Sequence, residues 1–325
     1  MASDLHAHWI PPALADALRA RTGGVPRIER AAGGERLVMP IGSLAFNDSY
    51  VDPQRRLAFM DRVGVRRQLL SLPGLFGVDS LPLAEAAPLV REFNDATAEL
   101  CRRHPDRFAG LAALPLADID QALAEFRRAR QQLGLLGAIL PVDAFASVEQ
   151  ARRLAPLLQA GDTLGAHFFI HPGRRPDSGP LPPVPPDNDL HRRALAVQHE
   201  VGEAMVTLLL SDVLAPYRNI SVQVANLGGT FPAVLERMDH TIATRQPGMP
   251  LPSSRSCPVL LDCSSLGPRT LRLAAATFGV ERIVLGTDCP IFDTEWTLRA
   301  VREAGLSAAE QELVLGKNAR RVLPL

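Results

Sequence analysis

Three histidines and one aspartate have the residue types and spacing of metal ligands. His6 and His8 are two residues apart in the segment DLHAH, so on a β-strand their side chains point the same way and can reach one ion. His171 ends an apolar run at 166–171, and Asp288 ends another at 282–288. Three imidazoles and one carboxylate suit Zn²⁺, with Mn²⁺, Fe²⁺ or Co²⁺ as alternatives. The alternative interpretation of His6 and His8 is a pair of structural histidines.

Four ligands so far apart in the chain require a scaffold that gathers distant segments. Short apolar runs recur along the whole sequence, and each is followed by a segment of helical periodicity. Strands that are apolar throughout and alternate with helices are typical of parallel sheets buried on both faces. We therefore predict a single (β/α)8 TIM-like barrel. Its predicted strands are 4–8, 65–72, 108–114, 137–142, 166–171, 220–226, 259–264 and 282–288, and its predicted helices include 53–63, 83–103, 119–133, 148–160, 194–214, 231–243 and 268–278.

The predicted barrel places all four candidate ligands on one face. His6 and His8 end the first strand, His171 ends the fifth and Asp288 ends the eighth. Barrels of this kind build their active sites at the C-terminal ends of the strands. The sequence therefore predicts one metal site at the barrel mouth.

Two segments depart from the alternation of strands and helices. Residues 24–52 are rich in glycine and turn residues, and we expect them to form a small hairpin over the barrel mouth. Residues 172–189 contain seven prolines and predict a stiff, extended active-site loop. An interdomain linker is the alternative for the second segment, but the strand count favours one domain over residues 1–325.

Composition narrows the class of protein. Of 325 residues, 46% are hydrophobic and 22% are charged, which indicates a folded globular chain. Lys plus Arg and Asp plus Glu both number 35, so no net charge favours nucleic acid or an anionic membrane as a partner. The four cysteines form no CxxC pair, and neither a signal peptide nor a membrane span is apparent. These features predict a cytoplasmic protein that binds a small molecule.

The motifs together resemble a known family, the amidohydrolase superfamily. Within it the sequence looks most like the aminocarboxymuconate semialdehyde decarboxylase branch, the Amidohydrolase_2 type. Besides HxH, the strand-five histidine and the strand-eight aspartate, the resemblance rests on the order of several short blocks. These blocks are 60–65 (MDRVGV), 209–214 (LLSDVL), 228–232 (GGTFP), 236–239 (ERMD), 282–290 (RIVLGTDCP) and 316–319 (GKNA). The resemblance implies that His6, His8, His171 and Asp288 are metal ligands and that Asp288 also transfers a proton.

One departure from the family pattern affects the chemistry. The family usually has a histidine before the glycines that follow strand six, where this sequence has Asn226. An amide donates and accepts hydrogen bonds but cannot take a proton near neutral pH. The chain also lacks a lysine after strand four, so the family's bridging ligand is missing and one metal ion is expected rather than two.

The resemblance also implies how a carboxylate substrate is held. In the decarboxylase branch two arginines on the helix after strand six bind the substrate carboxylate, partly across a dimer interface. Arg237 and Arg245 occupy the matching positions here. Guanidinium groups suit a carboxylate because they can pair with both of its oxygens. A homodimer is therefore expected, and ordinary surface arginines are the alternative.

These inferences lead to three hypotheses about function. The first is a mononuclear metal-dependent decarboxylase of a small unsaturated or aromatic carboxylic acid, with Asp288 and Asn226 in the catalytic site. The second is a metal-dependent hydrolase of an amide, an ester or a vinylogous C–C bond, which is weakened by Asn226. The third is a non-catalytic relative that keeps the barrel.

Overall fold

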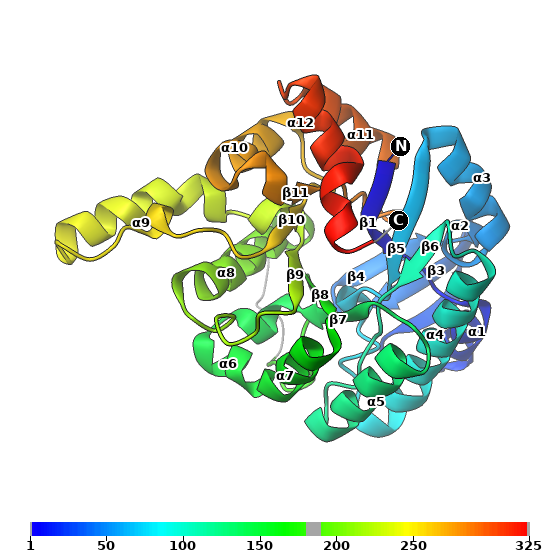
Figure 1. Ribbon diagram of the computed structural model, residues 1–325. Coiled ribbons are helices and arrows are strands. Elements are labelled where there is room, and N and C mark those ends of the chain that lie inside the picture. Colours follow the sequence, from blue (N-terminus) through cyan, green and yellow to red (C-terminus); the bar gives the residue numbers. More distant parts are fainter. Residues whose placement is uncertain (1, 180–189, 324–325) are drawn as a thin grey trace.

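Parallel strands form the centre of the protein, as the computed structural model of residues 2–179 and 190–323 shows (Figure 1). One sheet has the order β1-β5-β6 and a second has the order β11-β10-β9-β8-β7. All pairings within these two sheets are parallel. The strands are β1 (Ala2–His8), β5 (Val65–Ser71), β6 (Phe108–Gly110), β7 (Gly137–Pro141), β8 (His167–His171), β9 (Ser221–Val224), β10 (Leu260–Asp262) and β11 (Ile283–Val284).

The two sheets join into a closed barrel. A parallel bridge pairs Ala112 with Ala138, and another pairs Ala7 with Cys289. At the second junction the Leu5 amide donates to the Leu285 carbonyl at 2.8 Å. The predicted (β/α)8 barrel is therefore confirmed, although several strands are shorter than the apolar runs that predicted them.

Helices surround the barrel in the predicted alternation. They are α3 (Pro53–Val63), α4 (Leu83–Arg103), α5 (Ile119–Gln131), α6 (Val148–Arg153), α7 (Ala155–Leu164), α8 (Val197–Leu210), α9 (Phe231–Arg245), α10 (Pro268–Phe278), α11 (Thr294–Glu303) and α12 (Ala308–Glu312). The helix predicted at 148–160 is two helices that meet at Leu154, because the second begins with Pro156 in its first turn. None of the described helices is both long and apolar enough to cross a membrane.

The segment predicted as a hairpin is a larger unit. It forms an antiparallel sheet of β2 (Arg27–Ala31), β3 (Gly34–Met39) and β4 (Gly42–Phe46), followed by α2 (Asp48–Val51). Ile28, Leu37 and Phe46 on this sheet are buried in one cluster with residues of α1 (Pro12–Ala20) and with Phe76. Phe76 lies in the short helix that follows β5, so the sheet packs beside the C-terminal ends of the strands. The prediction missed one strand because the turn at Pro40 and Ile41 opens a second hairpin.

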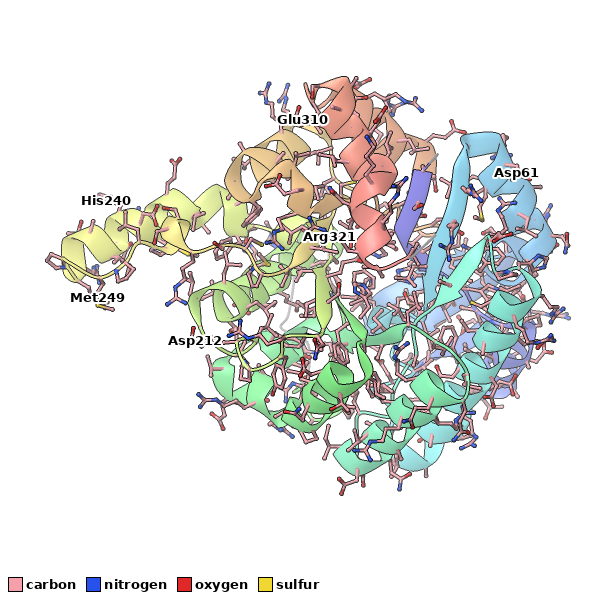
Figure 2. The ribbon with its side chains drawn as sticks, viewed as in Figure 1. Asp61, Asp212, His240, Met249, Glu310 and Arg321 are labelled. Carbon is pink, nitrogen blue, oxygen red and sulfur yellow. The ribbon has the colours of Figure 1, made fainter. Side chains whose placement is uncertain are left out.

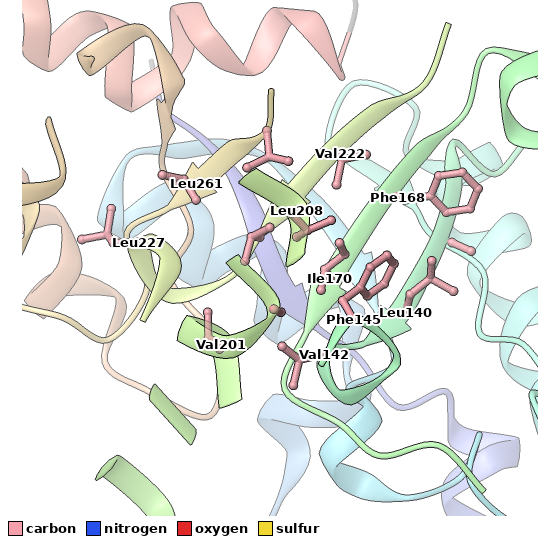
Figure 3. Packing of buried hydrophobic residues seen from close by; sticks show 14 of the residues in the cluster. Leu140, Val142, Phe145, Phe168, Ile170, Val201, Leu208, Val222, Leu227 and Leu261 are labelled. Atoms are coloured by element: carbon pink, nitrogen blue, oxygen red, sulfur yellow. The ribbon is translucent and has the colours of Figure 1, made fainter. Parts of the chain in front are cut away.

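Buried apolar side chains hold the strands in place. Leu140, Phe168, Ile170 and Val222 point outward from neighbouring strands and pack against the surrounding helices (Figure 3). Side chains of the barrel interior, among them Leu69 from β5, form a separate cluster. Each such side chain contributes about 1.5–3 kcal/mol when fully buried. This packing fixes where the strands end, and thereby where the candidate ligands lie.

The proline-rich loop is described only in part, because residues 180–189 of the predicted 172–189 segment lie outside the described residues. The Asp143 carboxylate accepts the Arg175 amide at 2.9 Å and the Ser178 hydroxyl. The described part of the loop is therefore anchored to the segment that follows β7.

A buried histidine at the start of β8 leads to a prediction about acid stability. Burial lowers the pKa of His167 from 6.5 to about 4. The unfolded chain therefore takes up the proton first, so the stability that neutral His167 provides is present above pH 6.5 and is lost as the pH falls toward 4. Between pH 7.5 and 4.5 wild type should lose about 2–3 kcal/mol more unfolding free energy than His167→Phe. Urea unfolding of both proteins at both pH values measures this, and equal losses would contradict the prediction.

Candidate metal centre

The four predicted ligands come together at the barrel mouth. One ligand atom from each of His6, His8, His171 and Asp288 lies within 4.8 Å of the others. The Nε2 atoms of His6 and His8 are 3.1 Å apart, and Oδ1 of Asp288 lies 3.1 Å from Nε2 of His8. His6 and His8 have no solvent exposure, and Asp288 keeps 8%. The structure therefore brings all four predicted residues together at one point.

The chemistry of this cluster fits a divalent transition metal. Oδ1 of Asp288 is buried and has no hydrogen-bond partner among the described residues. Two imidazole nitrogens that face each other and an unpartnered carboxylate oxygen are left without satisfaction unless a cation lies between them. Three imidazoles and a carboxylate are a donor set that zinc and its neighbours in the first transition row accept. His6, His8, His171 and Asp288 would hold the ion.

The opposite ring nitrogens are each fixed by an acceptor. Nδ1 of His6 lies 3.1 Å from Oδ1 of Asp262, and Nδ1 of His171 lies 2.8 Å from the Pro172 carbonyl. Nδ1 of His8 lies 3.3 Å from the carbonyl and 3.2 Å from the hydroxyl of Ser71. A proton on each Nδ1 satisfies these acceptors, which leaves the Nε2 lone pairs directed at the centre.

The local backbone explains how the side chains converge. Pairing between β1 and β5 is irregular between Asp4 and Ala7. An irregularity of this kind re-aims side chains along a strand. At Gly286 a Cβ would stand 2.7 Å from the Cβ atoms of both His6 and Asp262, so only glycine allows the approach. The Asp288 amide then donates to the His6 carbonyl at 2.7 Å.

Two site residues have left-handed backbone conformations. Asp288 has a φ of 58° and Asn226 has a φ of 56°. Asp and Asn tolerate this region better than most residues, but it still costs about 1–3 kcal/mol and is concentrated at functional sites. The surrounding hydrogen bonds hold both residues in place.

Asp262 belongs to the centre, and the sequence analysis did not identify it. Its Oδ1 contacts the His6 ring and accepts the Ser264 amide at 3.1 Å, and its Oδ2 accepts Nε2 of Gln223 at 2.8 Å. The residue is fully buried at the end of β10. The signal that could have found it is the one that identified Asp288, a carboxylate at the C-terminal end of a predicted strand.

Asp4 is the second carboxylate that the sequence analysis missed. It accepts the backbone amides of His6 and Thr287, the Thr287 hydroxyl at 2.7 Å, and Nε2 of Gln68 at 3.0 Å. These bonds tie β1 to the segment that carries Asp288. Burial raises the pKa of Asp4 to about 6, although the Thr287 hydroxyl and the His6 amide oppose the shift.

The three histidines differ in the direction in which their surroundings shift the pKa. Burial opposes a charge on His6, but the carboxylates of Asp262 and Asp288 outweigh it and raise the pKa of His6 to about 9. Burial likewise disfavours a charge on Asp262, yet His6 lowers the pKa of Asp262 to about 2. Burial and then the charge of His6 lower the pKa of His8 and of His171. In the absence of metal, His6 is therefore protonated and paired with Asp262, whereas the other two rings are neutral. A bound cation would take the place of the proton on Nε2 of His6.

Asn226 lies at the edge of the centre. Its side-chain Oδ1 accepts the Ser264 hydroxyl at 2.6 Å, and its backbone N–H donates to Oδ1 of Asp262 at 3.4 Å. The side chain is buried, with 5% exposure. Asn226 is thus linked through Asp262 to His6.

The two predicted substrate arginines do not reach the centre within the chain. Arg237 and Arg245 are exposed on α9, which extends away from the barrel (Figure 1). Figure 2 shows His240 on the same arm and Met249 near its tip. The predicted contact of Arg237 and Arg245 with substrate therefore depends on a second chain.

Comparisons with known proteins find similarity to an amidohydrolase family model and to several decarboxylases. A family model described as Amidohydrolase matches residues 3–325. Gamma-resorcylate decarboxylase of Rhizobium radiobacter is 26% identical over 290 residues, which cover 83% of this chain and 86% of that one. 2-Amino-3-carboxymuconate-6-semialdehyde decarboxylase of Dictyostelium discoideum is 26% identical over 340 residues, which cover 99% and 91%. The crystal structure of a dihydroxybenzoic acid decarboxylase from a Polaromonas species, with bound manganese and 2-nitroresorcinol, has a TM-score of 0.72 at 21% identity and 99% and 96% coverage.

The barrel and its histidine and aspartate cluster define a class of metal-dependent barrel enzymes with the active site at the C-terminal ends of the strands. Within that class, the Amidohydrolase family model matches nearly the whole chain, residues 3–325. The chain belongs to the amidohydrolase family.

The contact between Asp262 and His6 predicts a graded effect on metal binding. Asp262→Asn should weaken metal affinity about 10–100-fold, because the amide accepts the His6 proton more weakly and its NH2 group opposes Gln223. Replacing His6 and His8 together with alanine should reduce metal content to nearly none. Elemental analysis and chelator competition measure both effects. Glu125→Gln, which changes a carboxylate on α5, is the control, and undiminished affinity in Asp262→Asn would refute the positioning role.

Proposed function

We propose that this chain is a mononuclear metal-dependent carboxy-lyase that removes CO2 from a small aromatic or unsaturated carboxylic acid. The observation that carries the proposal is the Asp288 carboxyl group, which is buried against three metal-binding imidazoles and has an unpartnered oxygen. The named activities of the relatives, which are decarboxylases of a resorcylate and an aminocarboxymuconate semialdehyde, support the same reaction class.

Decarboxylation replaces a carbon–carboxylate bond with a carbon–hydrogen bond, so the site must supply a proton to carbon. Burial raises the pKa of Asp288, so its carboxylate takes up a proton more readily than an exposed one does. Asp288 then transfers its proton to the carbon atom that loses CO2, and returns to the carboxylate form. A bound divalent metal supplies positive charge that stabilises the negative charge developing on the substrate. His6, His8 and His171, which are all buried, would hold the ion.

Asn226 orients the substrate in this proposal. The Ser264 hydroxyl occupies its Oδ1, so its NH2 group can donate to a substrate oxygen. A neutral amide cannot remove a proton from water, and hydrolysis needs such a base. Asn226 therefore favours decarboxylation over hydrolysis.

Zinc is our proposal for the ion, because three imidazoles and one carboxylate are donors that it accepts readily. Manganese is the alternative, since the Polaromonas neighbour and a 5-carboxyvanillate decarboxylase from Novosphingobium aromaticivorans were crystallised with manganese bound. We further propose that residues 1–325 act as one domain. The four cysteines are free, which supports the proposed cytoplasmic location.

Product analysis and two variants test the proposed reaction. A panel of aromatic acids that includes 2,6-dihydroxybenzoate and 5-carboxyvanillate should yield a product lighter by CO2, as mass spectrometry measures. Asn226→Ala should slow this reaction about tenfold, because it loses one hydrogen bond worth roughly 0.5–1.5 kcal/mol. Asp288→Asn should abolish it, because the amide N–H is far too weakly acidic to protonate carbon.

Other outcomes would exclude this mechanism. Products whose summed mass exceeds that of the substrate by one water would indicate a hydrolase. The absence of any product from all acids of the panel would favour a non-catalytic relative. If Asn226→Ala and Asp288→Asn were equally inactive with metal still bound, Asn226 would have to be a central catalytic group.

The α9 arm supports the proposal of a homodimer. Arg237 and Arg245 are exposed on it, together with the apolar side chains of Val234, Met249 and Leu251. In the dimer that we propose, the arm covers the partner subunit and brings an arginine to the carboxylate of the partner's substrate.

Light scattering tests the dimer. The mass should be about twice 35.1 kDa, and Arg245→Ala should raise KM for the acid while kcat and the mass stay unchanged. A monomer at micromolar concentration would exclude a role for the arginines across the interface.

A further inference from the structure

A second cavity, of about 530 Å³, lies on the outer side of the barrel. It lies between α3 and the segment that follows β11, and none of the four candidate metal ligands lines it. Its lining includes Arg55, Arg56, Phe59, Arg62, Cys289 and Phe292. Volumes of this size are typical of small-molecule sites.

Arg56 brings an uncompensated positive charge to this cavity. Its side chain donates to the carbonyls of His8 at 2.6 Å and Ser49 at 3.0 Å, and to Oε1 of Gln68 at 3.2 Å. The residue keeps only 3% exposure, its Nε has no partner, and no described carboxylate forms an ion pair with it. Buried charges are normally paired, so an anion in the adjoining cavity would compensate this one.

The rest of the lining adds positive charge and apolar surface. Arg55, Phe59 and Arg62 are spaced along one face of α3. Arg55 is paired with Asp48 at 2.9 Å, whereas the Arg62 guanidinium lies 5.1 Å from the centre of the Phe59 ring. Asp293 is the one carboxylate among the lining residues; it accepts the Glu295 amide at 2.9 Å as the cap of α11, and its charge offsets one of the guanidinium groups. Phe292 is 48% exposed at the opposite wall. The cavity thus combines excess guanidinium charge with two aromatic rings.

We propose that this cavity binds a small organic anion with a flat apolar body, of which an aromatic carboxylate is the simplest example. The unpartnered Nε–H of Arg56 and the guanidinium of Arg62 would donate to the anionic group, and Phe59 and Phe292 would contact the ring. The site is separate from the metal centre, and the inference does not depend on the proposed decarboxylase activity. It adjoins the centre, because Arg56 binds the His8 carbonyl and Cys289 follows Asp288.

Isothermal titration calorimetry with benzoate tests this site. Metal-loaded wild type should bind benzoate in a component that Arg62→Ala and Phe292→Ala each weaken about fivefold or more, because each loses an ionic or a stacking contact. Arg299→Ala is the matched control, since this exposed arginine lies 5.1 Å over the Trp296 ring outside the cavity and should change affinity less than twofold. The same component should persist in the His6→Ala, His8→Ala protein, which lacks the metal centre.

Two further probes separate charge from apolar contact. Benzyl alcohol has the ring without the charge, and inorganic phosphate has charge without the ring, so both should bind at least about tenfold more weakly than benzoate. Benzoate affinity unchanged in Arg62→Ala and Phe292→Ala would overturn the proposal. The proposal would also be overturned if benzyl alcohol or phosphate bound as tightly as benzoate. A change in the oligomeric mass of these variants without any change in benzoate affinity would overturn it too.

Discussion

The metal centre depends on one buried contact, the pairing of the His6 ring with the Asp262 carboxylate. Ser71 and the Pro172 carbonyl fix the protons of His8 and His171, but His6 has only Asp262 to do so. Asp262 holds the proton of His6 on Nδ1 and leaves Nε2 directed at the centre. Loss of one member of a buried charged pair commonly costs several kcal/mol, because the other charge is left buried without a partner, so neither residue can be replaced alone without destabilising the fold.

A continuous layer of polar side chains supports that contact. Gln223 joins Asp262 to the Leu5 carbonyl of β1, and Gln68 joins Asp4 to Arg56. Each member is buried, and each hydrogen bond restrains an element that carries a ligand. The second cavity adjoins this layer at Arg56, so the same buried network reaches from the metal centre to the outer surface.

Much of this architecture could be predicted from sequence, for physical reasons that also set the limits. The eight strands were predictable because parallel strands buried on both faces are apolar throughout, and the four ligands were predictable because they end such strands. Asp262 ends a strand in the same way but was not recognised, because its role depends on the distance to a ring that is remote in sequence. The position of Arg237 and Arg245 relative to substrate was not accessible to periodicity, since it depends on where α9 projects and on a second chain.

Closure of the barrel has a consequence for the order of events during synthesis. Asp4 and Thr287 are 283 positions apart, yet they share the hydrogen bonds that seat Asp288 beside His6 and His8. A ribosome must release most of the chain before these partners can meet, and contacts of such long sequence separation form slowly. A chain that ends before Asp288 can therefore hold all three histidines of the site without their aspartate. Metal capture is then a late event that marks a completed barrel, and the bound ion would lock the first strand to the last.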